Sequence, residues 1–187
     1  DHYHYVEDGG CTYHSRYSSW SCYRGQESDN WVADLAPTPT EFAPNQLSPE
    51  GATGTLREMR RHGGWQNMHN RERLHSEDDF PMSKTFEDGI DFLNRNGRYD
   101  NWFLQIETFD PHEPFTSPIS HFDPDCATQP DWPPYADVTE GPEEIEAIRT
   151  KYEASVRFCD RQLGRVLDLM DELDLWKDTM LIVNTDH

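Results

Sequence analysis

Two short apolar runs with a long amphipathic stretch between them constrain the fold of this chain most. Residues 101–108 (NWFLQIET) and 179–185 (TMLIVNT) are rich in aromatic and branched residues and have the length of buried strands. Between them, apolar residues from about Pro142 to Leu173 recur at helical spacing. A strand, helix, strand order predicts an α/β fold with a mostly parallel sheet flanked by helices.

Two helices are expected beside these runs. The first lies near residues 85–96, where Phe86, Ile90 and Leu93 recur at helical spacing. The second covers residues 142–173 and carries one apolar residue on each successive turn. Its expected buried stripe consists of Ile145, Ile148, Tyr152, Val156, Cys159, Leu163, Leu167 and Met170.

The remaining segments are predicted to be largely irregular. Residues 1–50 contain glycine and proline clusters that interrupt helices, whereas residues 52–61 could form a short helix. Residues 110–142 are rich in proline and predict a long surface loop, which is usually functional or an insertion. The chain starts without Met and stops directly after an apolar run, so both ends are expected to be truncations.

Composition excludes several functional classes. The chain has 187 residues, enough for one domain with a core. Its formal net charge of −20 makes nucleic-acid binding unexpected, because phosphate contacts need a basic surface. No apolar run approaches the roughly 20 residues of a membrane helix, so no membrane partner is expected. No CxxC pair exists to build a zinc ribbon, and reduced cysteines are expected at Cys11, Cys22, Cys126 and Cys159.

Polar side chains follow both predicted strands at the point where each ends. Asp110 and His112 come after the first strand, and Asp186 and His187 come after the second. Ligands of open α/β sheets bind beyond the carboxyl ends of strands, so both clusters should lie on one rim. A carboxylate beside an imidazole can bind a metal ion. A histidine in a proline-flanked loop suits contact with an oxygen anion.

His2 and His4 form a third candidate cluster. On an extended segment, positions i and i+2 point to the same side, so both imidazoles could bind a metal or an anionic ester. Each of the three clusters also has a plainer interpretation. An Asp-His pair can cap a turn, a histidine in a proline-rich loop can be structural, and His-x-His can be surface decoration.

Four stretches resemble the sulfatases of the alkaline phosphatase superfamily. Residues 103–115 (FLQIETFDPHEPF) resemble the family's strand and Asp-Pro-His loop, and residues 152–187 resemble its helix, connector and strand ending in an Asp-His metal motif. Residues 85–96 are similar to the helix before the first strand, and residues 1–10 lie where many sulfatases have a Lys-x-His element. The resemblance implies that residues 1–187 are the central part of one sulfatase-like catalytic domain, incomplete at both termini.

The resemblance also implies hydrolysis of sulfate esters and assigns roles to five residues. Asp186 and His187 would bind a divalent cation, usually calcium in this family, while the single imidazole leaves Mg²⁺ or Mn²⁺ open. His112 would hydrogen-bond the oxygens of the sulfate ester. His2 or His4 would contact the leaving-group oxygen as a general acid, although this sequence has no Lys in that element.

The nucleophile of the family is a formylglycine made from Cys or Ser in a Cys-x-Pro-x-Arg motif. Cys11 is followed by no proline at the required position, and Cys22 has Arg24 only two residues later. The nucleophile is therefore expected upstream of Asp1, and the isolated chain is expected to have little or no activity. The expected partner is a sulfated small molecule or a glycan.

Other functions remain open on sequence alone. A phosphodiesterase or phosphonate monoester hydrolase would share the fold and the metal motif, and its phosphate ester would need similar charge neutralisation. A non-catalytic domain that kept the fold is a second alternative, and an acidic α/β domain without a site is a third. Four tryptophans could stack on sugar rings, although packing is their commoner role: Trp20, Trp31, Trp65 and Trp132.

Overall fold

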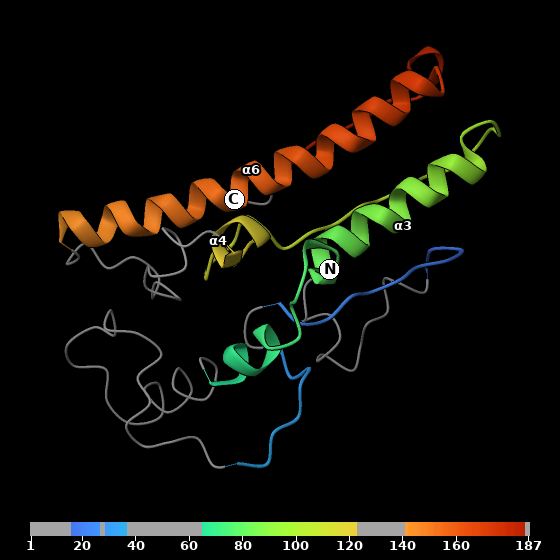
Figure 1. Ribbon diagram of the computed structural model, residues 1–187. Coiled ribbons are helices and arrows are strands. Elements are labelled where there is room, and N and C mark those ends of the chain that lie inside the picture. Colours follow the sequence, from blue (N-terminus) through green and yellow to red (C-terminus); the bar gives the residue numbers. More distant parts are fainter. Residues whose placement is uncertain (1–15, 27–28, 37–64, 123–140, 186–187) are drawn as a thin grey trace.

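The computed structural model describes residues 16–26, 29–36, 65–122 and 141–185. Its elements are helical residues 65–71, the 3₁₀ turn η2 (Glu77–Asp79), α3 (Pro81–Asn96), α4 (Pro118–Phe122), α6 (Pro142–Glu172) and the 3₁₀ turn η3 (Leu175–Lys177). Helices α3 and α6 lie alongside each other, and α4 lies against α6 (Figure 1). No helix among these residues combines the length and apolar character of a membrane span.

Helix α3 confirms the predicted helix but starts earlier, at Pro81. Proline suits the first helical position because its fixed φ fits the helix and its missing N–H would have no partner there. The preceding turn is closed by Asp79, whose carboxylate accepts a hydrogen bond from the backbone N–H of Ser76 at 2.8 Å. The helix ends where the N–H of Gly97 donates to the carbonyl of Leu93 at 2.8 Å.

Helix α6 confirms the predicted long helix, but the expected buried stripe is wrong for part of its length. Ile145, Tyr152 and Val156 are exposed. The buried face is rotated around the helix: small and polar residues dominate its first part, and apolar residues dominate its last part. That face consists of Lys151, Ala154, Ser155, Phe158, Gln162, Val166, Leu169 and Met170.

The hydrophobic core lies between α3 and α6. The rings of Phe80 and Phe158 meet edge to face with centroids 6.2 Å apart, which joins the start of α3 to the middle of α6. Burial of apolar side chains is the main stabilising contribution here. The buried members are Leu74, Phe80, Met82, Phe86, Leu93, Phe158, Val166, Leu169, Met170 and Leu175.

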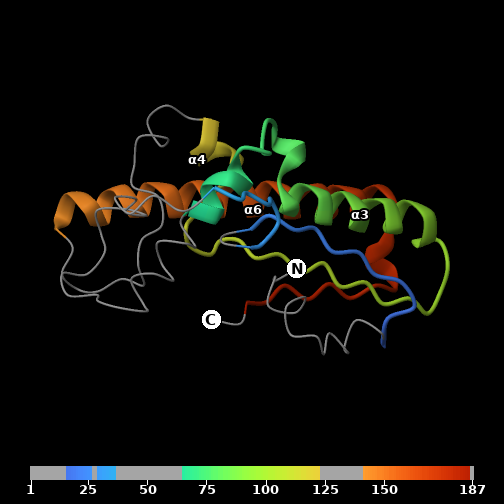
Figure 2. The same cartoon turned by 90° about the horizontal axis from the view of Figure 1, so that it is seen from below.

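The predicted parallel sheet is wrong for the part of the chain that the structure describes. That part contains no strand, and residues 101–108 and 179–185 are extended segments instead. No backbone hydrogen bond joins these two segments among the described residues, and a ladder of such bonds is what makes a sheet. In Figure 2 both segments, together with residues 16–26, lie on one side of the pair formed by α3 and α6.

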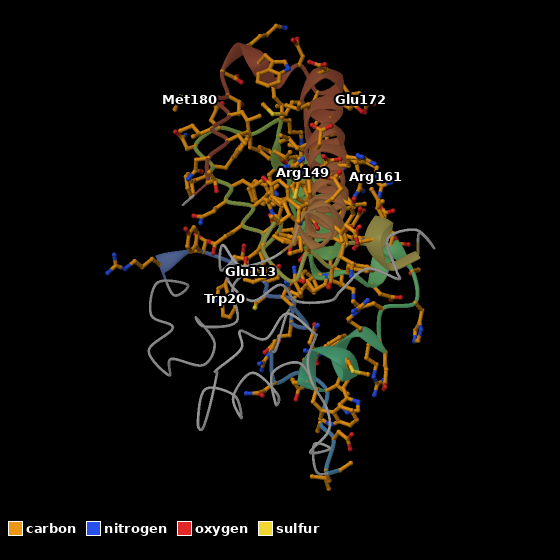
Figure 3. All side chains as sticks on the ribbon, turned by 90° about the vertical axis from the view of Figure 1, so that its left-hand side faces the viewer. Trp20, Glu113, Arg149, Arg161, Glu172 and Met180 are labelled. Carbon is orange, nitrogen blue, oxygen red and sulfur yellow. The ribbon has the colours of Figure 1, made fainter. Side chains whose placement is uncertain are left out.

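The two extended segments are also less buried than strands inside a parallel sheet. Leu104 and Ile106 pack against the core, but Phe103, directly before Leu104, is 72% exposed. In the second segment Leu181 packs inward, while Met180 is 81% exposed and lies at the outer margin of the molecule (Figure 3). The helices therefore cover one face of the first segment, whereas in the second segment the neighbouring residues Ile182 and Val183 are both exposed.

Gly89 allows the first extended segment to approach α3 closely. A Cβ atom at this position would lie 2.4 Å from Cδ1 of Ile106. That separation is far inside van der Waals contact, so a larger residue would push Ile106 out of its place under the helix. The glycine therefore sets the distance between α3 and the segment that leads to Asp110.

Candidate functional site

The loop from Asp110 to Phe115 carries the one predicted catalytic residue that the structure describes, His112. Its ring packs on Phe109, with centroids 4.3 Å apart. Its Nδ1 atom lies 2.9 Å from the backbone carbonyl of Glu113 and 3.3 Å from Oε2 of that residue. The imidazole is therefore held on one side by a ring and on the other by oxygen atoms. In the view of Figure 3, Glu113 lies between α6 and helical residues 65–71.

The loop is anchored to α6 at its far end. Phe115 meets Tyr152 of α6 edge to face, with centroids 5.4 Å apart. The Ser120 hydroxyl donates to the carbonyl of Phe115 at 2.9 Å and accepts from the backbone N–H of Ser117 at 2.8 Å. These bonds close the turn before α4, which itself lies against α6. The position of His112 is thus determined by the packing of α4 and α6.

Asp110 lies at the start of the loop and is partly buried. Its Oδ2 atom accepts a hydrogen bond of 2.9 Å from Nε2 of Gln26, a residue far away in sequence. Burial raises the pKa of Asp110 to about 6, and the hydrogen bond from Gln26 and the nearby His112 oppose that rise. This carboxyl can therefore change its charge close to neutral pH.

Cys159 of α6 faces the same region. Burial, followed by the charge of Asp110, raises the pKa of the Cys159 thiol to about 12. A thiol of this kind stays protonated at neutral pH and is a poor nucleophile. Neither Cys22 nor Cys159 forms a disulfide among the described residues, whereas Cys11 and Cys126 lie outside them.

The segment that carries Gln26 is held by a buried carboxylate. Asp29 is fully buried, and its oxygens accept hydrogen bonds from Nε of Arg24 at 3.0 and 3.1 Å and from the backbone N–H of Gly25 at 2.9 Å. Asn70 donates from Nδ2 to the backbone carbonyl of Asp29 at 2.7 Å. This network ties the turn beside Gln26 to helical residues 65–71. The sequence carries no periodic signal for it, because Asn70 lies 41 residues from Asp29 in the chain.

The tryptophans with a possible sugar-stacking role have different surroundings. Trp20 is exposed, whereas Trp31 and Trp65 are partly buried, and Trp31 packs against the core. Gly25 has a φ of +114°, and a Cβ there would lie 2.5 Å from the ring of Trp31. Trp31 is thus a packing residue, and Trp132 lies outside the described residues.

The other predicted site residues lie outside the described residues: His2, His4, Asp186 and His187. Where they lie relative to His112 is therefore not described, and their roles remain predictions. Within the described ranges, no group of three or more His, Cys, Asp or Glu side chains is arranged to hold a metal ion. The donor set of Asp186 and His187, one carboxylate and one imidazole, suits a divalent cation.

The described part of the site combines an imidazole with a carboxyl that titrates near neutral pH. A fixed imidazole can donate a hydrogen bond to an oxyanion or transfer a proton. Carboxyls with raised pKa values are concentrated at functional sites, because burial at such sites alters proton affinity. The arrangement is suited to contact with an anionic ester.

Comparison with known proteins identifies the family. The profile of the Sulfatase family matches residues 10–187, a range that includes α3, the loop with His112 and α6. No curated protein and no solved structure matches the chain significantly. Because the family match covers nearly the whole chain, the protein belongs to the Sulfatase family, a family of hydrolases.

Proposed function

We propose that this chain acts in the hydrolysis of sulfate esters, with His112 in contact with the sulfate group. The observation that carries the proposal is the fixed position of His112 in a chain that matches the Sulfatase family. The imidazole is partly buried and is held between Phe109 and the carbonyl of Glu113. A group with so little freedom loses little conformational entropy when it binds a sulfate oxygen.

His112 would act as an imidazolium. Its Nδ1–H is directed at the carbonyl of Glu113, and its Nε2–H would donate a hydrogen bond to a sulfate oxygen as negative charge develops there. A donor of this kind is effective because its position is set before the reaction starts. Asp186 and His187 would hold a divalent cation, with calcium as the expected species, that neutralises charge on the sulfate. His2 or His4 would protonate the leaving-group oxygen. The formylglycine motif of the family does not occur within residues 1–187.

The test is an assay of the gene product that contains this chain, produced together with a formylglycine-generating enzyme. We expect release of 4-methylumbelliferone from its sulfate ester. The His112→Ala variant should lower kcat/KM roughly a hundredfold or more, the effect of removing one oxyanion donor. The matched control is His75→Ala, since His75 is exposed and lies outside the loop. Equal activity of the two variants would contradict the role of His112.

The same assay separates sulfate from phosphate chemistry. We expect kcat/KM for the sulfate ester to exceed that for bis(p-nitrophenyl) phosphate and for a phenyl phosphonate ester. The opposite order would favour a phosphodiesterase or phosphonate monoester hydrolase. Sulfate release by the purified chain 1–187 above that of its His112→Ala, Asp186→Ala double variant would contradict the expected inactivity of the isolated chain.

Chelation tests the expected cation. Treatment with EDTA should abolish hydrolysis, and added Ca²⁺ should restore it, because the sulfate charge would otherwise be uncompensated. If Mg²⁺ or Mn²⁺ restores hydrolysis and Ca²⁺ does not, the bound ion is not calcium. Full activity after exhaustive chelation would contradict the assignment of Asp186 and His187 as metal ligands.

A further inference from the structure

We propose that Gln26 is a positioning residue for His112 and acts through the side chain of Asp110. This inference rests on the proposed hydrolysis of sulfate esters and adds to it a residue outside the loop that contains His112. Its basis is the hydrogen bond of 2.9 Å from Nε2 of Gln26 to Oδ2 of Asp110. That bond joins residues 16–26, which with residues 29–36 form the described N-terminal segment, to the first residue of the loop.

The geometry gives Gln26 this role because its own segment is held rigidly. Arg24 and the backbone N–H of Gly25 both bond the buried carboxylate of Asp29, and Asn70 bonds the carbonyl of Asp29. Gln26 adjoins this turn, so its amide is presented to Asp110 from a fixed backbone. A hydrogen bond from such a support restrains its acceptor more than one from a mobile surface chain.

Asp110 transmits the restraint because it is two residues from His112 and interacts with it electrostatically. Three groups among the described residues face the Asp110 carboxyl from different elements. They are the amide of Gln26 from the N-terminal segment, the imidazole of His112 from the loop and the thiol of Cys159 from α6. The amide of Gln26 donates to the carboxylate and so favours its charged form.

Loss of the Gln26 amide should therefore have two effects. The first is a looser loop, in which His112 samples positions that do not favour the transition state. The second is a higher pKa of Asp110, because the hydrogen bond that stabilises its carboxylate is gone. A residue with a merely structural role elsewhere in the fold would produce neither effect at Asp110 and His112.

The experiment compares Gln26→Ala with Gln162→Ala in two measurements. Gln162 is the matched control, because its Nε2 also donates to a carboxylate far away in sequence, Oε1 of Glu77 at 3.3 Å, but it takes no part in the network around Asp29. The first measurement is NMR of the chain labelled with ¹³C, following the Asp110 carboxyl and the His112 ring from about pH 5.5 to about pH 8. The second is kcat/KM for the aryl sulfate, measured on the enzyme that contains the chain.

In the wild-type chain the Asp110 carboxyl should titrate at about pH 6. Gln26→Ala should raise that midpoint and shift the His112 ring signals, and it should lower kcat/KM roughly three- to tenfold, as expected for one lost hydrogen bond. Gln162→Ala should change neither the Asp110 midpoint, nor the His112 ring signals, nor kcat/KM. A His112 signal unaltered by Gln26→Ala, or altered equally by Gln162→Ala, would overturn the inference.

The two measurements also keep this inference separate from the proposed function. If the wild-type enzyme releases no sulfate, the proposed function fails. The NMR result still decides whether Gln26 controls Asp110 and His112. If the enzyme is active and Gln26→Ala retains the full kcat/KM of the wild type, the positioning role fails and the sulfatase activity stands.

Discussion

Two ionisable side chains at the base of the His112 loop hold their protons more tightly because the fold buries them. Burial raises the pKa of Asp110 to about 6 and that of Cys159 to about 12. The proximity of the Asp110 carboxylate adds to the second shift, because a negative charge disfavours a thiolate. Both effects depend on α6 and the N-terminal segment meeting at the loop, and each can be tested at a single residue.

The raised pKa of Asp110 predicts a stability that falls with rising pH. Between its ordinary pKa of 3.8 and about 6, the folded chain binds more protons at Asp110 than the unfolded chain does. Stability is therefore lost as pH rises through this window. Between about pH 5.5 and about pH 7.5, the free energy of unfolding of the wild type should fall by roughly 1 kcal/mol more than that of Asp110→Asn.

Urea unfolding followed by tryptophan fluorescence measures this difference. The lower pH stays above the isoelectric point of about 4.6, where the chain would be least soluble. Asp160→Asn serves as control, since Asp160 is an exposed residue of α6. If the free energy of unfolding depends on pH equally in the wild type and in Asp110→Asn, burial does not raise the proton affinity of this carboxyl.

The raised pKa of Cys159 predicts a thiol that resists alkylation. At about pH 8 roughly one Cys159 side chain in ten thousand would be a thiolate, which is the reactive form. Iodoacetamide labelling followed by peptide mass spectrometry should leave Cys159 unmodified in the folded chain and modify it fully in urea. Labelling of Cys159 at the rate of a free thiol in the folded chain would contradict this prediction.

At the scale of elements, the register of α6 is the clearest difference between pattern and structure. The apolar periodicity of α6 places Val156 in the buried stripe, yet Val156 is 38% exposed, and Phe158 is fully buried. Helical periodicity identifies an apolar side, but α6 has apolar residues on more than one side. Which side is buried is decided by what packs against it, namely α3 and α4.

Alanine substitution distinguishes the two registers. Phe158→Ala should destabilise the chain by about 3–5 kcal/mol, because it removes a core ring that packs on Phe80. Val156→Ala should cost less than about 1 kcal/mol, since its side chain is outside the core and partly hydrated. Thermal or urea unfolding of both variants supplies the comparison. A larger loss of stability for Val156→Ala than for Phe158→Ala would support the buried face expected from the apolar pattern.

For the molecule as a whole, attachment of the N-terminal segment depends on polar contacts. Asn70 is fully buried and accepts hydrogen bonds from the N–H of Val32 at 3.2 Å and from Gln66 at 3.0 Å, in addition to its own bond to Asp29. Polar groups buried in this way are costly if a partner is removed. This segment therefore docks by satisfying hydrogen bonds as well as by packing Trp31 against the core, and it carries Gln26 to the site.

Removal of the Asn70 amide tests this mode of attachment. Asn70→Ala should destabilise the chain by about 2–3 kcal/mol and speed amide exchange at Val32. The N–H of Val32 and the carbonyl of Asp29 both lose the Asn70 amide as their hydrogen-bond partner. Hydrogen exchange with mass spectrometry reports on Val32 and on α3 separately. Asn94→Ala is the matched control on an exposed face of α3. Unchanged protection at Val32 in Asn70→Ala would contradict the role of this network.

The sequence by itself determined the family, the two long helices and the loop with His112. Apolar periodicity located α3 and α6 because helices are local structures, and the motif around His112 is contiguous in the chain. The sequence interpretation was wrong about the sheet. Apolar runs at 101–108 and 179–185 have the composition of strands, but a sheet also needs backbone partners at ladder spacing, which residue type does not specify.

Only the tertiary structure decided which distant residues meet at the site. The bond from Gln26 to Asp110 and the closeness of Cys159 depend on three segments that come together in space. No spacing rule links these positions, because long-range contacts follow from packing and not from local periodicity. The raised pKa of Asp110 follows from the same packing, since desolvation is a property of the assembled fold and not of the residue type.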